Sequence, residues 1–194
     1  MNTILIEQDF NSPHRYIDEE FNVDQDETVF DIGAADGNFS LEVVDRCDKI
    51  FLFESNTQWI SPLSKTFENY GDKVEIINKK AGDKNDKSTV KIDSIVGEVK
   101  NNLFFKIDVD GFEREVLKGM CNILRSAVGL KIAICTYHNQ DDAVEFEIFF
   151  KNLGFETSFT PGVMLFHYDK KIRKPFFRKG VLKAYKPENR DKKS

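Results

Sequence analysis

Residues 29–40, VFDIGAADGNFS, contain the feature that most restricts what this chain can fold into. The run Val29–Ile32 is apolar except for one acid and is typical of a buried parallel strand. Gly33 and Gly37 frame a turn, and a helical pattern begins at Asn38. Glycines let a backbone approach a ligand closely, and a helix N-terminus offers unpaired N–H groups. The stretch therefore predicts the strand, turn and helix that open a nucleotide-binding α/β domain.

The order of the acid and the glycines in this turn differs from that of a dinucleotide site. A dinucleotide fingerprint reads G-x-G-x-x-G, whereas this turn has alanine at the second glycine position and no third glycine. The turn is similar to the D-x-G-x-x-x-G motif of class I S-adenosylmethionine (SAM) methyltransferases. An acid suits SAM because this ligand carries an ammonium and a sulfonium but no phosphate. An ordinary tight strand-to-helix turn is the alternative. The cofactor-binding candidates here are Asp31, Gly33, Ala34, Ala35, Gly37 and Asn38.

The next two predicted strands add candidates for the remainder of a cofactor site. Residues 49–54, KIFLFE, form the second strand, and its last residue lies about twenty residues after the glycine turn, where a carboxylate hydrogen-bonds ribose hydroxyls. An acid that merely ends a strand is the alternative. Residues 74–78 form the third strand, and the turn 79–86 that follows would lie near an adenine. These segments contribute Glu54, Ser55 and Ala81 to the predicted cofactor-binding set.

Strands continue to alternate with helices along the chain. Buried strands are predicted at 103–111 and 129–136, with a helix from Phe112 between them and another over 141–153. Alternation of this kind predicts a mostly parallel sheet. Three further strands, at 155–159, 163–168 and 174–185, would supply an antiparallel ending.

Two other segments have weaker patterns. Ser12 followed by Pro13 is a plausible helix start, and Tyr16, Ile17 and Phe21 would share one apolar face, so we expect a short helix over the edge of the cofactor site. Residues 88–92 alternate apolar and polar side chains and predict an exposed strand or hairpin arm.

Composition limits the class of protein. A chain of 194 residues that is 40% hydrophobic and 31% charged suits one domain with a full core. No apolar run approaches the ~18 residues of a membrane span, and the first ten residues lack a signal-peptide pattern. Cys47, Cys121 and Cys135 are odd in number and widely spaced, which predicts reduced thiols in a cytoplasmic protein and shows no zinc-binding spacing.

Charge is concentrated at the end of the chain. Residues 169–194 hold eleven lysines or arginines against three acids, a net charge of +8, whereas the whole chain carries −5. A basic stretch of this kind can attract nucleic acid, anionic lipid or an anionic glycan. A solvated hairpin with a frayed end is the plainer interpretation.

Two segments resemble the FkbM-type family of SAM-dependent methyltransferases. One is VFDIGAADGNFS with FLFES a strand later, and the other, more specific, is FFKIDVDGFEREVLKGM, similar to the family signature K-I-D-[VI]-[ED]-G-x-E-x-x-V-L-x-G. Asp110 stands where the family usually has glutamate, and Ser55 where it often has proline. The resemblance covers roughly residues 28–154. It implies a seven-stranded Rossmann-like methyltransferase fold and transfer of a methyl group to oxygen, often on a sugar hydroxyl of a glycan or natural product.

With this resemblance the chain divides into three parts. Residues 1–27 are expected to form an N-terminal helical extension, residues 28–186 the SAM-binding methyltransferase domain, and residues 187–194 a basic, frayed tail.

A hydroxyl acceptor needs a base, or a metal that acidifies it. Ligands of open α/β sheets bind at the carboxyl ends of the strands, where Asp108 and His138 fall. We therefore expect His138 to take the acceptor's proton and Asp108 to orient the acceptor or the methionine end of SAM. His138 could instead only hydrogen-bond a loop carbonyl. Mg²⁺ or Mn²⁺ held by Asp108, Asp110 and His138 is possible but not favoured, because nothing in the spacing demands it.

Two other functions stay open on the sequence. A catalytically silent SAM-binding or scaffold protein would keep the fold and use the basic segment for contacts. A nucleic-acid methyltransferase guided by that segment is less favoured, because the N/D-P-P-Y/F/W tetrad of amino-methylating enzymes is missing after the fourth strand. The expected acceptor is a small molecule or a glycan, and an anionic acceptor is among the candidates.

Overall fold

The computed structural model of the chain describes residues 8–96, 102–166 and 172–187. The strands are β1 (Thr28–Ile32), β2 (Lys49–Phe53), β3 (Val74–Ile77), β4 (Lys80–Ala81), β5 (Thr89–Val90), β6 (Leu103–Ile107), β7 (Leu130–Cys135), β8 (Glu156–Phe159) and β9 (Val181–Lys186). The helices are α2 (Asn38–Val43), α3 (Thr57–Thr66), the 3₁₀ stretch η1 (Glu68–Lys73), α4 (Ile92–Val96), α5 (Glu113–Gly119), α6 (Cys121–Ser126) and α7 (Asp142–Asn152).

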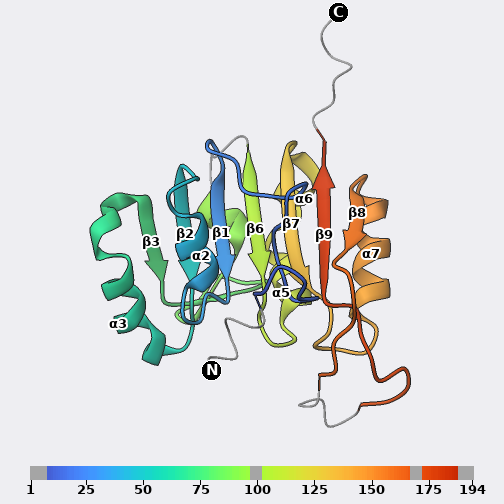
Figure 1. Cartoon of the computed structure of the whole chain (residues 1–194). Coiled ribbons are helices and arrows are strands. Elements are labelled where there is room, and N and C mark those ends of the chain that lie inside the picture. The colour runs from blue at the N-terminus through green and yellow to red at the C-terminus, as the bar shows by residue number, and fades with distance from the viewer. Residues whose placement is uncertain (1–7, 97–101, 167–171, 188–194) are drawn as a thin grey trace, which may run out of the picture.

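A seven-stranded sheet runs through the middle of the molecule (Figure 1). Its strand order is β3-β2-β1-β6-β7-β9-β8. The first five of these strands are parallel, and β9 runs antiparallel to both β7 and β8. The predicted mostly parallel sheet with an antiparallel C-terminal strand is confirmed. Because β1, β2, β6 and β7 are parallel, their carboxyl ends meet at one edge, the lower edge in Figure 1.

Side-chain alternation along the central strands creates two separate cores. On one face, Phe30 of β1 stacks on Phe51 of β2 and Phe105 of β6, with ring centroids 5.0 and 4.6 Å apart, in the register of the strand pairing. Helices α4, α5, α6 and α7 contribute apolar side chains to this core. The other core holds Val29 and Phe104 and is closed by α2, α3 and the N-terminal segment, residues 8–27. The sheet therefore lies between two covering layers.

The N-terminal segment differs from its prediction. Within residues 8–27 the chain forms turns and bends, so the helix expected after Ser12 and Pro13 is wrong for this part. Tertiary contacts override the local signal: the Thr160 hydroxyl donates to the Pro13 carbonyl at 2.5 Å, and the buried Tyr16 and Ile17 pack into the second core. The N-terminal segment therefore packs across the sheet without forming a helix.

The C-terminal strands also differ in part. Strand β8 is where it was expected, but β9 begins only at Val181, and residues 174–180 are not a strand. The strand predicted at 163–168 is reduced to a single bridge between Met164 and Arg178, and its last two residues lie outside the described part. Arg178 is buried and donates to the Tyr137 and His138 carbonyls at 2.7 and 3.0 Å, which draws this stretch under the end of β7 instead of into the sheet.

The segment expected as an exposed strand or hairpin arm forms β5, which pairs in parallel with β4 and buries Val90. Strand β1 starts at Thr28 and β9 ends at Lys186; of the predicted basic tail, residues 188–194 lie outside the described part. No helix built from the described residues is long and apolar enough to cross a membrane.

We predict that Gly33→Ala destabilises the protein more than Gly154→Ala does. Both glycines have left-handed backbones, with φ of +81° and +82°, and this strain alone costs about 1–2 kcal/mol for alanine. A Cβ on Gly33 would lie 1.8 Å from the Asp108 main-chain oxygen, whereas a Cβ on Gly154 would meet nothing within 4 Å. Urea unfolding measures the difference between the two variants, and equal losses would contradict the close approach of β1 to β6.

Candidate active site

A buried ion pair organises the turn after β1. Asp31 and Lys106 are register partners on β1 and β6, and the Lys106 ammonium lies 3.0 Å from Asp31 Oδ1. The same ammonium donates to the Gly33 carbonyl, and the Ser40 hydroxyl donates to Asp31 Oδ2 at 2.8 Å. Burial disfavours the charged lysine, but the carboxylates of Asp31 and Asp108 raise the pKa of Lys106 above its usual value. The pair fixes the turn against the neighbouring strand.

Strand β2 holds the other side of the turn. The Gly33 and Ala34 amides both donate to the Phe53 carbonyl, at 3.0 and 3.1 Å. One oxygen of the buried Glu54 carboxylate accepts from the Ala35 amide at 2.9 Å, and the other accepts from the Asn56 amide at 2.6 Å. A carboxylate has about four acceptor sites, so two remain for hydroxyl donors of a ligand.

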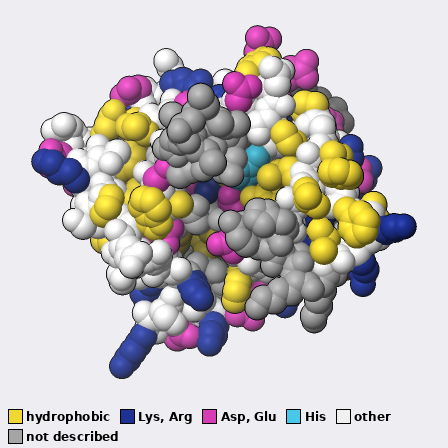
Figure 2. All heavy atoms as spheres, turned by 60° about the horizontal axis from the view of Figure 1, so that its bottom comes forward, with side chains coloured by type: hydrophobic (Ala, Val, Ile, Leu, Met, Phe, Trp, Pro, Cys, Tyr) yellow, Lys and Arg dark blue, Asp and Glu magenta, His cyan; other side chains and the backbone are white. Residues whose placement is uncertain are grey.

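A cavity of about 260 Å³ lies at the carboxyl ends of the parallel strands, where ligands of open α/β sheets bind. Figure 2 looks onto this end of the sheet and shows acidic side chains around a hollow near the middle of the face. The cavity has the glycine turn on one side, apolar walls suited to a flat ring, and carboxylates on the rim. It is lined by Ile32, Gly33, Ala35, Phe53, Glu54, Ser55, Lys79, Lys80, Ala81, Asp108, Val109, Asp110 and Phe112.

Six of the predicted cofactor residues line this cavity, and four do not. Gly33, Ala35, Glu54, Ser55, Ala81 and Asp108 are in the lining. Asp31 is fully buried, pairs with Lys106 and is outside the lining. Asn38 donates to Asp36 instead, and Ala34 and Gly37 are also outside the lining. Strand alternation explains Asp31, because its side chain belongs to the core covered by α2.

Asp108 stands directly after β6 and is shared by two groups of side chains. Its Oδ2 accepts from the Tyr16 hydroxyl at 2.7 Å and lies 3.2 Å from His14 Nε2, and its Oδ1 lies 3.5 Å from His138 Nε2. Burial opposes ionisation, but the His14 hydrogen bond and the charges of Lys106, His14 and His138 hold the pKa of this carboxyl well below its usual range. Asp108 is therefore a carboxylate at neutral pH, with 18% of its side chain exposed.

His138 lies behind the cavity rim. Its Nδ1 is 2.8 Å from Glu113 Oε1, and its Nε2 is 3.6 Å from Asp110 Oδ1. Its side chain is only 2% exposed, whereas that of Asp110 is 96% exposed. Burial lowers the pKa of His138, but the Glu113 hydrogen bond and the Asp108, Glu113 and Asp110 charges outweigh it and raise the pKa above the usual histidine value. The predicted pair is thus brought together, with Asp108 facing the cavity and His138 touching Asp108 and Asp110.

Sequence reasoning missed several residues of this site. Glu113 was matched only as part of a signature, although it is fully buried and also accepts from the Val109 amide at 3.1 Å. His14 and Tyr16 come from the N-terminal segment, which carries no motif and was expected to be a helix. Tyr137, which follows β7, is not among the predicted site residues, yet its hydroxyl lies 3.1 Å from His14 Nε2.

The metal site that the sequence left possible but not favoured can be judged from the same geometry. Asp108, Glu113 and His138 place ligand atoms within 4.8 Å of one another. Glu113 contacts Nδ1 of the imidazole and Asp108 faces Nε2, so these three cannot share one ion through a single ring nitrogen. Asp108, Asp110 and His138 Nε2 do converge, through contacts of 3.5 and 3.6 Å.

Comparison with solved structures identifies the fold. An rRNA methylase from Streptococcus thermophilus superimposes with a TM-score of 0.53 at 19% identity, covering 86% of this chain and 90% of that one. A precorrin-6y C5,15-methyltransferase from Geobacter metallireducens gives 0.54 at 15% identity, covering 85% and 84%. A putative tRNA (m1A22) methyltransferase from Streptococcus pneumoniae gives 0.55 at 13% identity, covering 89% and 71%. The fold is that of class I SAM-dependent methyltransferases. No curated protein sequence matches the chain.

The family follows from the sequence model that matches. The Methyltransferase FkbM domain matches residues 21–157, and the chain therefore belongs to the FkbM family of SAM-dependent methyltransferases. The cavity fits the SAM expected in such an enzyme: Glu54 has acceptor sites left for ribose hydroxyls, and Phe53, Ala81 and Phe112 give apolar walls for an adenine.

We predict that Glu54→Gln weakens SAM binding roughly ten- to a hundredfold. A hydrogen bond to a charged group is worth about 1.5–3 kcal/mol, and glutamine loses that charge while it keeps one oxygen for a backbone amide. Glutamine is preferable to alanine because Ala35 and Asn56 both donate to this side chain. Titration calorimetry gives the dissociation constant, and Glu75→Gln, an exposed strand acid paired with Lys49, is the matched control. Equal affinities of the two variants for SAM would mean that Glu54 only ends a strand and does not bind the cofactor.

Proposed function

We propose that this enzyme transfers the methyl group of SAM to a hydroxyl of a sugar, glycan or natural product. The observation that carries the proposal is the pairing of carboxylates and imidazole at the cavity: Asp108 and Asp110 line it, and His138 contacts both. Carboxylate oxygens accept hydrogen bonds from hydroxyl groups, and imidazole is a proton acceptor near neutral pH. This set of groups suits an acceptor that must lose a proton as it reacts.

Methyl transfer is an in-line displacement in which positioning supplies much of the rate. The acceptor oxygen attacks the methyl carbon, the carbon–sulfur bond breaks, and S-adenosylhomocysteine leaves with the electron pair. Asp108 and Asp110 hold the hydroxyl by accepting its hydrogen bond. The released proton passes by way of these carboxylates to His138, which Glu113 orients from the opposite ring nitrogen. The sequence predicted that His138 takes the proton directly from the acceptor. The proposal inserts the carboxylates between them, because His138 does not line the cavity.

A nucleic-acid acceptor is the alternative, because two structural neighbours are an rRNA methylase and a putative tRNA (m1A22) methyltransferase. Those identities are below 20% and bear on the fold alone. The acids at the rim argue against a polyphosphate next to the transferred methyl group, since Asp110 is almost fully exposed there. Lys79 and Lys80, on the wall of the cavity, are the cations that a phosphate would meet.

We predict that methyl-labelled SAM labels a neutral hydroxylated acceptor and not RNA. The assay incubates the protein with panels of glycans, sugar-containing natural products and total RNA, and mass spectrometry locates the added methyl group on the product. Attachment to oxygen supports the proposal. Labelling confined to RNA, or to nitrogen or carbon, would overturn it, and SAM binding without turnover on any panel would favour the silent scaffold.

We predict that His138→Asn lowers kcat by roughly 10²–10⁴-fold, as loss of a general base does, with SAM affinity little changed. Asparagine keeps a donor toward Glu113, so the variant retains the buried contact of the imidazole Nδ1. Asp108→Asn should lower kcat as well, because the carboxylate that faces the acceptor is lost. Asp141→Asn removes an exposed acid from the same end of the sheet, paired with Arg173, and serves as control. Full activity in both His138→Asn and Asp108→Asn would exclude these roles.

A further inference from the structure

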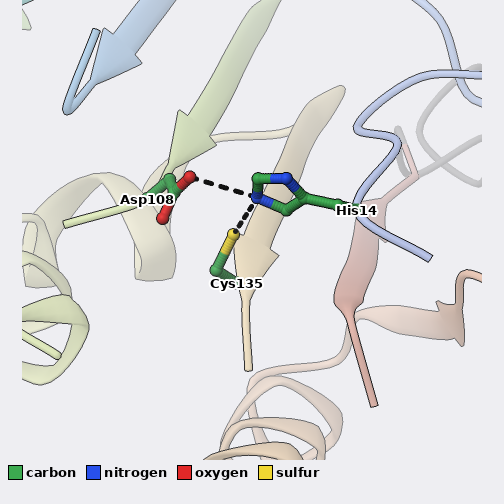
Figure 3. A group of neighbouring side chains, drawn as sticks. All are labelled: His14, Asp108 and Cys135. Atoms are coloured by element: carbon green, nitrogen blue, oxygen red, sulfur yellow. Dashed lines mark hydrogen bonds and ion pairs between the residues drawn. The ribbon is translucent and has the colours of Figure 1, made fainter. Parts of the chain in front are cut away.

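One imidazole nitrogen is crowded by polar atoms beside the cavity. His14 Nε2 lies 3.0 Å from the Tyr16 hydroxyl, 3.1 Å from the Tyr137 hydroxyl, 3.2 Å from Asp108 Oδ2 and 3.5 Å from Cys135 Sγ. Figure 3 shows the Asp108 carboxylate and the Cys135 sulfur directed toward the same edge of the imidazole, from the ends of two neighbouring strands. The histidine comes from the N-terminal segment on the other side of them.

Hydrogen bonding alone does not explain this convergence. An imidazole nitrogen has a single hydrogen-bonding site in the ring plane, either an N–H or a lone pair. A proton on Nε2 can be directed at Asp108, but it cannot serve the sulfur and two phenol oxygens as well. Tyr16 already donates to Asp108 at 2.7 Å. A metal ion, in contrast, requires several ligand atoms gathered around one point within a buried site.

The two separations from His14 Nε2 also match those between ligands of a tetrahedral ion. With Zn–N and Zn–O near 2.05 Å and Zn–S near 2.3 Å, tetrahedral angles give N···O of about 3.3 Å and N···S of about 3.5 Å. The corresponding distances from His14 Nε2 are 3.2 Å to Asp108 and 3.5 Å to Cys135, and the ligand atoms of all three residues lie within 4.8 Å of one another. We propose that His14, Asp108 and Cys135 bind a Zn²⁺ ion.

The donor set selects the metal. Thiolate and imidazole suit zinc, whereas Mg²⁺ takes oxygen ligands. Binding displaces the Cys135 thiol proton to solvent, because the thiolate is the ligand. The ion would tie the N-terminal segment to the ends of β6 and β7 and hold Asp108 by Oδ2, which leaves Oδ1 for His138. The proposal does not depend on the identity of the methyl acceptor.

Cobalt substitution tests the site directly. Full-length protein is stripped with a chelator and titrated with Co²⁺, and we expect one equivalent to produce a thiolate-to-cobalt charge-transfer band with intense visible bands of a tetrahedral site. Zn²⁺ should displace the cobalt and abolish the spectrum. Cys135→Ser should lose the charge-transfer band, and Cys47→Ser, a change at another buried cysteine whose thiol donates to the Val44 carbonyl, should keep it.

A second variant covers the case in which Cys135→Ser does not fold. His14 lies outside the sheet, and His14→Gln should weaken Zn²⁺ binding by more than the roughly 10–100-fold that an outer-shell partner costs. Circular dichroism and SAM binding check that each variant is folded. A wild-type protein that gives no charge-transfer band would overturn the proposal, as would a band kept in Cys135→Ser or lost in Cys47→Ser. These readings need no turnover, so a failed methyl-transfer assay leaves the metal result intact.

Discussion

The site depends on the interactions of the buried Lys106 ammonium group. It joins Asp31 on the neighbouring strand to the Gly33 carbonyl in the turn. An ammonium in an apolar core is tolerated only with such partners, and removing one partner of a buried pair typically costs about 3–5 kcal/mol. The pair thus locks β1 to β6 and brings the glycine turn against the Asp108 main chain. The cofactor side and the chemical side of the cavity share this one constraint.

Asp108 is the residue to which we assign the acceptor-binding role. Each of its oxygens serves a different neighbour, one the N-terminal segment and the other His138. Because positive groups surround it, the carboxyl stays ionised in spite of its burial, and it can accept a hydrogen bond without taking the proton permanently. A residue held from both sides also has little freedom to turn away from the cavity, which favours a preorganised acceptor site.

The sheet was predictable because its signals are local. Apolar runs bounded by glycine and acid gave the parallel strands, and distance along the chain placed Glu54 at the cavity. The residues whose surroundings the sequence did not predict depend on partners elsewhere in the chain. Asp31 has the identity of a ligand-binding acid, but its side chain meets Lys106 on the adjacent strand. Ser12 and Pro13 have the local pattern of a helix start. Contacts of Pro13 with Thr160 and of Tyr16 with Asp108 override this pattern. No pattern of residues within 8–27 indicates that the His14 side chain reaches β7.

The N-terminal segment has a consequence for how the enzyme is assembled. His14 is separated by 94 residues from Asp108 and by 121 from Cys135, so its contacts have among the highest loop-closure costs of the site. On the ribosome this histidine emerges before any strand of the sheet, but Asp108 and Cys135, which receive it, are made only after more than half of the given sequence. We infer that this segment, although it precedes the sheet in the chain, is among the last to find its place, and that the pocket is completed only once the central strands have paired.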